Sequence, residues 1–600
     1  MHRIWKNALG NIARTFRFIY QHSPRWTLLH MFTATVMGVL PLALIYLIKL
    51  LVDEVTRAVD KGPEGAGLEG ILWIIIATGV VFFLNSVFGS WLNLIKEKHT
   101  RQIEDLMYEK IQNKASSLDL SYYENPRHHD IIFRAEQESR YRPQQIITGL
   151  ITVIQNTISL VMVAAMLSAL NWTIIGVLAV AVIPAVYVKF RYNEKNYRLF
   201  RRHTEDLRKT FYFNRVLTEK DFAKELRLFG LASYFRQQFA YLRQKIWDKK
   251  YRLLRRKTIL ETLSHLVAAA AIFGAFAWLT RDAIRGSITI GSLVMYFLVI
   301  RRGFTFLKSL MDGFSKLYEQ NLFLDNLFEF LNLKPRLSAP TQAPPRLEEP
   351  VSIRMENVHF RYPNTKQWVL QNLNLHIPAG KTVAFVGENG AGKTTLIKLL
   401  CRFYDPASGT IRFNGVDLRD MPKEQVHGHI SVLFQDFILY HLTAGENIWF
   451  GDTKKPYDER LLSESAQMAG IHNRIGALDN RYDTFLGNLF NNSAELSIGE
   501  WQKLAIARAY FRDAGLYILD EPSSSMDPKT EQEVFTRFKK LIEGKTAIII
   551  SHRFTTISMA DYIYVLDGQS IQEEGTHQQL MAQNGHYAQL YRTQAQHYQQ

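Results

Sequence analysis

Six apolar stretches, each long enough to cross a lipid bilayer, occupy most of the first half of this 600-residue chain. A membrane-spanning helix needs about 20 predominantly apolar residues, and inside lipid such a stretch must satisfy its own backbone hydrogen bonds. We therefore expect an α-helical transmembrane domain over residues 26–333. Its predicted spans are residues 26–52, 70–95, 146–169, 172–189, 259–279 and 288–311.

The connections between these spans differ in charge. Residues 189–257 hold 21 Lys and Arg against 7 Asp and Glu, whereas residues 53–69 hold 5 acidic residues against 2 basic ones. Because basic loops are retained on the cytoplasmic side, we expect the long loops and both termini to be cytoplasmic in a multi-pass protein of the cell (inner) membrane. This asymmetry accounts for most of the formal net charge of +16, so no nucleic-acid partner is expected.

Several segments outside the spans also carry structural signals. Residues 1–25 mix apolar and basic positions without a cleavage site of small residues, which predicts an interfacial amphipathic helix rather than a signal peptide; an ordinary surface helix is the alternative. The long loops are predicted to be helical up to turns where residues 127–135 and 214–223 touch the soluble part; solvated connections are the alternative. Residues 334–350 contain five prolines and form a linker.

The last predicted span contains three basic residues, Arg301, Arg302 and Lys308. Ionisable side chains inside a bilayer are costly unless they face water or a partner. Two interpretations follow from this cost. Either the three side chains line a path for a substrate, anionic in character, or the span ends earlier and leaves them at the cytoplasmic interface.

A glycine-rich motif, GENGAGKTT, occupies residues 387–395 in the second half of the chain. It fits the pattern G-x-x-x-x-G-K-[ST], and the apolar run before it and the helical spacing after it predict a strand, a turn and a helix. In that arrangement backbone amides and the helix N-terminus bind a polyphosphate. The residues expected to bind ATP here are Gly387, Asn389, Gly390, Gly392, Lys393, Thr394 and Thr395, and the Thr394 hydroxyl is also expected to ligate Mg2+.

An apolar strand that ends in two carboxylates follows at residues 516–521. Asp520 suits a ligand of Mg2+ and its water shell, and Glu521 suits the group that polarises an attacking water. Strands and helices alternate across residues 351–600, which predicts an α/β P-loop NTPase domain with a mostly parallel sheet and an early antiparallel part. The single cysteine, Cys401, excludes an intrachain disulfide and a cysteine-based metal cluster.

The order and spacing of these motifs resemble those of ATP-binding cassette exporters that carry one six-helix membrane domain and one nucleotide-binding domain per chain. The resemblance covers essentially the whole length. It implies that Tyr362 in FRYP stacks on adenine, and that Gln435 in LFQDF senses both Mg2+ and the attacking water. It also implies that Asp527 in SSSMD belongs to the loop that crosses the dimer interface, and that His552 in ISHR is the catalytic switch histidine at the γ-phosphate.

The signature motif departs from the usual LSGGQ of the family. Ser497 and Gly499, which the resemblance places against the γ-phosphate of ATP, are kept in LSIGE. Ile498 replaces a glycine and Glu500 replaces a glutamine, so the sequence predicts reduced backbone freedom and an added negative charge near the phosphates. Weakened ATP-driven closure is one expected consequence, but the remaining catalytic set favours an active ATPase.

The resemblance implies half a transporter that pairs with a second half-transporter, here a homodimer because the motif set is complete. ATP and Mg2+ would drive alternating access and the export of a substrate. The segments AKELRLFG (223–230) and GEWQKLAIARA (499–509) resemble those of exporters of modified peptides, while amphipathic drugs and lipids stay open as substrates. Two alternatives are an ATP-gated channel or regulatory protein that does not pump, and a soluble P-loop enzyme tethered to a membrane.

Overall fold

The computed structural model describes residues 16–61, 68–125, 131, 142–168, 172–337, 347–363, 365–522, 528–551 and 553–599. The chain divides into two compact units. Unit 1 comprises Met1–Ser117 and Arg127–Leu333, and unit 2 comprises Leu118–Pro126 and Lys334–Gln600.

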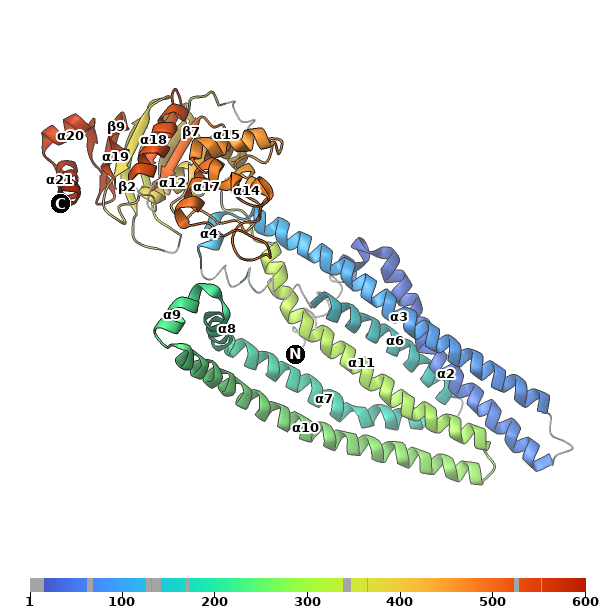
Figure 1. Ribbon diagram of the computed structural model, residues 1–600. Helices are drawn as coiled ribbons and strands as arrows, with labels where there is room; N and C mark the ends of the chain where they lie inside the picture. The colour runs from blue at the N-terminus through green and yellow to red at the C-terminus, as the bar shows by residue number, and fades with distance from the viewer. Residues whose placement is uncertain are drawn as a thin grey trace. The chain divides into compact units, whose positions relative to one another are not determined.

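Unit 1 is built from long helices (Figure 1). Five of them, α2, α3, α6, α10 and α11, are long and apolar enough to cross a membrane, as judged over the described residues. The sixth predicted span, residues 172–189, is helical within α7. The helices are α2 (Pro24–Lys61), α3 (Leu68–Ser117), α6 (Arg142–Ser168), α7 (Trp172–Arg202), α8 (Thr204–Thr218), α9 (Ala223–Leu228), α10 (Ala232–Ile284) and α11 (Ile290–Leu331).

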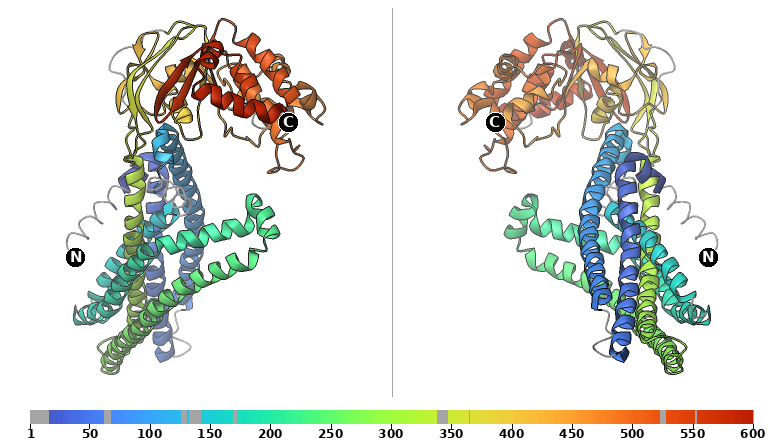
Figure 2. Two further views of the ribbon diagram at one scale, coloured as in Figure 1. Left: turned by 90° about the vertical axis from the view of Figure 1, so that its left-hand side faces the viewer. Right: turned by 90° about the vertical axis from the view of Figure 1, so that its right-hand side faces the viewer.

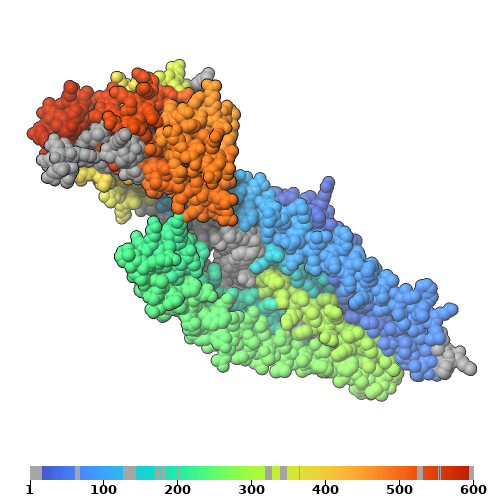
Figure 3. All heavy atoms as spheres, viewed as in Figure 1, coloured from blue at the N-terminus to red at the C-terminus, as the bar shows by residue number. Residues whose placement is uncertain are grey.

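Helices α3 and α10 extend far beyond the length that a bilayer requires. They have 50 and 53 residues, which at about 1.5 Å per residue gives roughly 75 to 80 Å, against a hydrocarbon core of about 30 Å. Helices α8 and α9, with the adjoining ends of α7 and α10, form an arm that diverges from α11, whereas the opposite ends of α7 and α10 contact α11 (Figure 2). The predicted tip at 214–223 lies at the end of this arm (Figure 3), where α8 stops at Thr218.

Two other predicted segments lie largely outside the described residues. Of the predicted tip at 127–135, only Ile131 is described. Of the predicted interfacial helix at 1–25, residues 16–25 are described; residues 16–22 are helical, and α2 begins at Pro24.

Unit 1 contains a buried apolar cluster, and a polar contact lies beyond one end of it. Leu42 of α2, Leu279 of α10 and Val299 of α11 belong to one buried cluster. At the far end of α2, the Asp53 carboxylate accepts a hydrogen bond of 2.9 Å from the Gly291 amide in the first turn of α11. This bond joins α2 and α11 where both leave the apolar cluster.

Unit 2 contains two β-sheets. The first is antiparallel with strand order β2-β1-β4-β5, and the second has order β10-β9-β3-β8-β7-β6 and is parallel except for β10. The predicted mostly parallel sheet with an early antiparallel part is therefore present. The strands are β1 (Ile353–Phe360), β2 (Leu370–Ile377), β3 (Thr382–Val386), β4 (Ser408–Phe413), β5 (Val416–Asp417), β6 (Ile430–Leu433), β7 (Leu516–Asp520), β8 (Thr546–Ile550), β9 (Tyr562–Asp567) and β10 (Ser570–Gly575).

Helices cover the parallel sheet. Strands β3, β7 and β8 are buried at every residue, as expected for parallel strands that have helices on both faces. The longer helices of unit 2 are α12 (Lys393–Leu400), α15 (Glu459–Ala469), α17 (Ile498–Phe511), α18 (Pro528–Leu541) and α21 (His586–Gln599).

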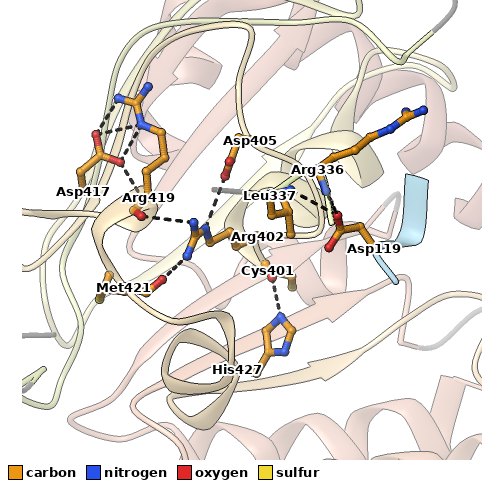
Figure 4. A network of polar contacts seen from close by, with 10 residues as sticks. All are labelled: Asp119, Arg336, Leu337, Cys401, Arg402, Asp405, Asp417, Arg419, Met421 and His427. Carbon is orange, nitrogen blue, oxygen red and sulfur yellow. Dashed lines mark hydrogen bonds and ion pairs between the residues drawn. The ribbon is translucent and has the colours of Figure 1, made fainter. Parts of the chain in front are cut away.

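A buried arginine fixes the end of helix α12. Arg402 is 2% exposed, donates hydrogen bonds to the carbonyls of Met421 and Arg419, and forms an ion pair with Asp405 at 3.4 Å (Figure 4). A buried charge of this kind is tolerated because its donors are satisfied. The network holds the helix that begins at the glycine-rich loop against the segment around residues 417–421.

The segment that follows α3 belongs to unit 2. Residues 118–125 include the short helix α4 (Leu120–Tyr123). The Asp119 carboxylate accepts hydrogen bonds from the amides of Arg336 and Leu337, which follow α11 (Figure 4). The chain segments that leave α3 and α11 are therefore hydrogen-bonded to each other within unit 2.

Candidate nucleotide site

The glycine-rich loop connects β3 to α12, as its sequence predicts. Gly392 is the N-cap of α12 and has φ 101°, a conformation that favours glycine. A Cβ on Gly387 would lie 2.1 Å from the Leu566 carbonyl oxygen, so a side chain cannot fit there. Asn389 and Gly390 lie on the exposed part of the loop. The loop thus has the backbone freedom and the close approach that phosphate binding requires.

Lys393 is held inside the loop that precedes it. Its ammonium donates hydrogen bonds to the carbonyls of Gly387 at 2.7 Å and Glu388 at 2.8 Å. Burial lowers the pKa of Lys393, and the nearby carboxylates of Glu521 and Asp520 oppose that shift. The loop therefore encloses the ammonium, where a phosphate bound by the loop could replace the two carbonyls.

Four side chains from three elements converge beside this lysine. The Thr394 hydroxyl donates to the Asp520 carboxylate at 3.4 Å, and the Gln435 amide donates to the Glu521 carboxylate at 2.7 Å. Burial, together with the negative charge of Glu521, raises the pKa of Asp520 to about 6. The site therefore holds excess negative charge that a cation would neutralise.

The backbone at Glu521 is strained. Its φ is 47°, which is uncommon for a residue with a side chain. Its amide donates to the Ile550 carbonyl at 2.9 Å, which ties this conformation to the end of the neighbouring strand β8. Strain of this kind is retained where the surrounding structure imposes it, often at functional sites.

Tyr362 lies next to α12. Its hydroxyl lies 3.0 Å from the hydroxyl of Thr395, so Thr395 is hydrogen-bonded to the residue that is predicted to stack on adenine. The Tyr362 ring meets the Tyr404 ring edge to face at 5.4 Å, and the Lys398 ammonium lies 5.3 Å from its centre. The aromatic residue is thereby fixed from three sides.

The signature residues form a helix cap. Ser497 is the N-cap of α17, its hydroxyl accepts from the Glu500 amide at 3.3 Å, and the Glu500 carboxylate accepts from the Ser497 amide at 2.8 Å. This reciprocal pair is a capping box. Gly499 lies in the first turn of α17, and Ile498 is 56% exposed, so its side chain fills no core position.

The charge of Glu500 is compensated locally. The Arg474 guanidinium donates to its carboxylate at 2.8 Å. Although burial acts in the opposite direction, hydrogen bonds from Ser497 and Arg474 hold the pKa of Glu500 below its usual value. The negative charge expected from the sequence is therefore met by a cation that sequence reasoning did not identify.

Asp527 and His552 lie outside the described residues. The geometry therefore concerns the other predicted site residues. It brings Lys393, Thr394, Gln435, Asp520 and Glu521 together in one cluster and sets Tyr362 and Thr395 against the same helix.

One polar contact near this site was missed by sequence reasoning. Glu124, in the segment after α3, forms an ion pair of 2.6 Å with Lys398 of α12. It also accepts a hydrogen bond from the Tyr404 hydroxyl. The two residues are 274 positions apart in the sequence. No local sequence pattern predicts so distant a partner.

Comparison with known proteins places this geometry in a family. Residues 370–524 match the family model described as ABC transporter. The chain is 31% identical over 582 residues to the subtilin transport ATP-binding protein SpaT of Bacillus subtilis, covering 96% of this chain and 92% of that protein. It is 27% identical to the ATP-dependent lipid A-core flippase of Salmonella typhimurium (strain LT2), covering 87% of this chain and 88% of that protein.

A solved structure has the same fold. It is a bacterial Atm1-family ABC exporter with ATP bound, with a TM-score of 0.82 and 23% sequence identity over 95% of this chain and 99% of that chain. Together with the near full-length match to SpaT, these findings show that the chain belongs to the ABC transporters, as a membrane-embedded half-transporter of the exporter type whose ATPase domain drives export.

Proposed function

We propose that two copies of this chain form a homodimer in the cytoplasmic membrane and export a peptide, with the nucleotide-binding domains on the cytoplasmic side. The observation that carries the hydrolytic part is the cluster of Lys393, Thr394, Gln435, Asp520 and Glu521. The peptide substrate is supported by the relative with the higher identity and the longer coverage, which is named for subtilin transport. A lipid substrate has the weaker support of the flippase match.

Hydrolysis follows from groups already in position. Loop amides and Lys393 bind the β- and γ-phosphates, and Lys393 exchanges its carbonyl partners for phosphate oxygens. Glu521 accepts the proton of the attacking water, and Gln435, hydrogen-bonded to Glu521 at 2.7 Å, orients that water. Tyr362 stacks on adenine.

The donor set fits Mg2+. A hydroxyl from Thr394, a carboxylate from Asp520 and an amide oxygen from Gln435 are the hard oxygen ligands that this ion prefers. When bound, the ion neutralises negative charge on the phosphates. The proximity of Thr394 to Asp520, at 3.4 Å, and the repulsion between the carboxylates of Asp520 and Glu521 support this assignment.

The dimer follows from the signature. The Ser497 hydroxyl accepts a hydrogen bond from the Glu500 amide in its own helix cap. Ser497 is also exposed, so it is accessible to the ATP bound by a second copy. Asp527 and His552 are proposed to complete the composite site. The strongly basic loops of the sequence support a cytoplasmic position for these domains.

Transport into sealed inside-out vesicles tests the proposal. Purified wild-type protein is reconstituted, and ATP-dependent accumulation of a labelled amphipathic peptide is measured against a Glu521→Gln control that binds ATP and hydrolyses it slowly. Accumulation against a gradient supports the proposed function. ATP-dependent ion conductance without accumulation would support a channel, and movement of labelled lipid alone would make the substrate a lipid.

A further inference from the structure

A cavity of about 240 Å³ lies among helices α7, α10 and α11 of unit 1. Five ionisable side chains line it: Lys189 from α7, Glu261 and His265 from α10, and Lys308 and Asp312 from α11. The last predicted span contains Arg301, Arg302 and Lys308, and of these three residues Lys308 lines the cavity.

The five side chains come from the same end of the predicted membrane spans. Lys189 ends the apolar stretch 172–189, Glu261 and His265 begin the stretch 259–279, and Lys308 lies near the end of 288–311. With the long loops on the cytoplasmic side, all of these ends are cytoplasmic. The cavity thus lies at the inner mouth of the membrane domain, where an exporter first meets its substrate.

The lining holds two lysines and two carboxylates, and each carboxylate is paired with a cation other than Lys308. The Asp312 carboxylate pairs with the Lys189 ammonium, and the Glu261 carboxylate lies 3.6 Å from Lys257 on the same helix. Among the described residues, no carboxylate oxygen lies within the 4.0 Å ion-pair limit of Lys308. Lys308 is exposed on α11, so its ammonium is accessible to a ligand that enters the cavity.

Size and lining restrict the ligand. Drug-sized ligands occupy pockets of roughly 300 to 1,000 Å³, so a cavity of about 240 Å³ holds a group the size of a side chain rather than a whole ligand or a lipid headgroup. The remaining wall is largely apolar and includes Val186, Phe304 and Met311. A carboxylate can pair with the Lys308 ammonium, and apolar side chains beside that carboxylate can pack against the apolar wall.

We propose that this cavity, centred on Lys308, is a substrate subsite that receives an acidic side chain or terminal carboxylate of the exported peptide. The inference rests on the proposed peptide export and deepens it by naming the chemical group that is recognised. The Lys189–Asp312 pair provides a second cation that can exchange its partner as the substrate enters or leaves. Recognition through exchangeable ion pairs permits release, which a tight site would prevent.

ATPase stimulation in lipid nanodiscs tests the subsite. The probes are a synthetic amphipathic peptide with one Leu-Glu-Leu triplet and its Leu-Gln-Leu twin, each titrated against full-length wild type, Lys308→Gln and Lys308→Arg. Arg302→Gln is the matched control, because Arg302 is an exposed basic residue of α11 that is not among the cavity-lining residues.

The expected result is specific to the carboxylate. A charge-assisted hydrogen bond contributes about 1.5 to 3 kcal/mol, so Lys308→Gln should raise the half-stimulating concentration of the Glu peptide at least tenfold and leave the Gln peptide unchanged. Lys308→Arg and Arg302→Gln should resemble wild type.

Three outcomes would overturn the subsite. Equal responses to both peptides in wild type, equal losses for both peptides in Lys308→Gln, or stimulation by anionic lipid alone that is lost in Lys308→Gln would each do so. Failure of the proposed function looks different, because then neither peptide stimulates wild type although basal ATP hydrolysis persists. In that case peptide export and the subsite fall together.

Discussion

Replacing Glu500 tests whether its carboxylate is a harmful charge beside ATP or a capping group for helix α17. If the carboxylate is mainly a harmful charge beside ATP, Glu500→Gln should accelerate hydrolysis. The structure instead shows a capping partner of Ser497 that is neutralised by Arg474. We therefore expect Glu500→Gln to leave ATP hydrolysis within about twofold of wild type and Glu500→Ala to slow it about tenfold.

The magnitude comes from the cap and the ion pair. Loss of a helix cap costs about 0.5 to 2 kcal/mol, and Gln preserves this part because its amide oxygen still accepts from the Ser497 amide. The Arg474–Glu500 pair has side chains that are 40% and 28% exposed, so it contributes only about 0.2 to 1 kcal/mol. A tenfold loss of rate corresponds to about 1.4 kcal/mol of activation free energy, and we expect a loss of this size when Ala no longer holds the Ser497 hydroxyl in place.

The assay is steady-state ATP hydrolysis by purified full-length protein, with thermal unfolding measured in parallel. Arg474→Gln is the matched control, because it removes the cation and keeps the cap. A tenfold acceleration in Glu500→Gln would refute the compensated-charge explanation, and wild-type activity in Glu500→Ala would refute the role of the cap. Since the folded pKa of Glu500 is depressed below its unfolded value of about 4.3, its stabilising contribution is present at neutral pH. That contribution is lost as pH falls through the folded pKa.

Three further predictions concern other parts of the chain. Glu521→Gln should retain ATP binding but lower turnover by about 10²- to 10⁴-fold through loss of the general base; a wild-type rate in single-turnover experiments would exclude that role. Gly291→Ala should destabilise the protein by about 1 to 3 kcal/mol, because the new Cβ would lie 2.4 Å from the Asp53 carboxylate. The effect is measured as heat inactivation against Gly274→Ala, where nothing lies within 4 Å. Cys401 is buried and its pKa is raised to about 12 by burial, so maleimide should label it only after unfolding, and rapid labelling of native protein would contradict its burial.

Much of the fold could be predicted because its signals are local. Apolar stretches of span length define helices, and glycines at fixed spacing between an apolar run and a helical pattern define the loop at 387–395. The Asp520–Glu521 pair follows the same logic, since it ends a strand. These features depend on neighbours in the sequence, so composition and periodicity are sufficient to find them.

The contacts that adjust the site could not be predicted in this way. Arg474 lies 26 residues before Glu500, and Glu124 lies in the half of the sequence that is mostly membrane helices, yet pairs with Lys398. Such pairs depend on how elements fold onto one another, and a charged residue in a loop gives no sign of its partner. The reach of α3 and α10 past the bilayer was expected from the long loops, but their end points were set by tertiary packing.

Helix α12 has eight residues and is about 12 Å long. Each of its two turns carries a lysine with a separate role. Lys393 at its start is the residue proposed to bind the phosphates, while Lys398 on the next turn forms an ion pair of 2.6 Å with Glu124, beside the ring of Tyr362. The proposed phosphate contact and the contact to the segment that follows α3 therefore lie on one short helix. We expect a nucleotide that shifts α12 to shift Glu124 with it, because the Lys398 ion pair connects α12 to the segment that follows α3.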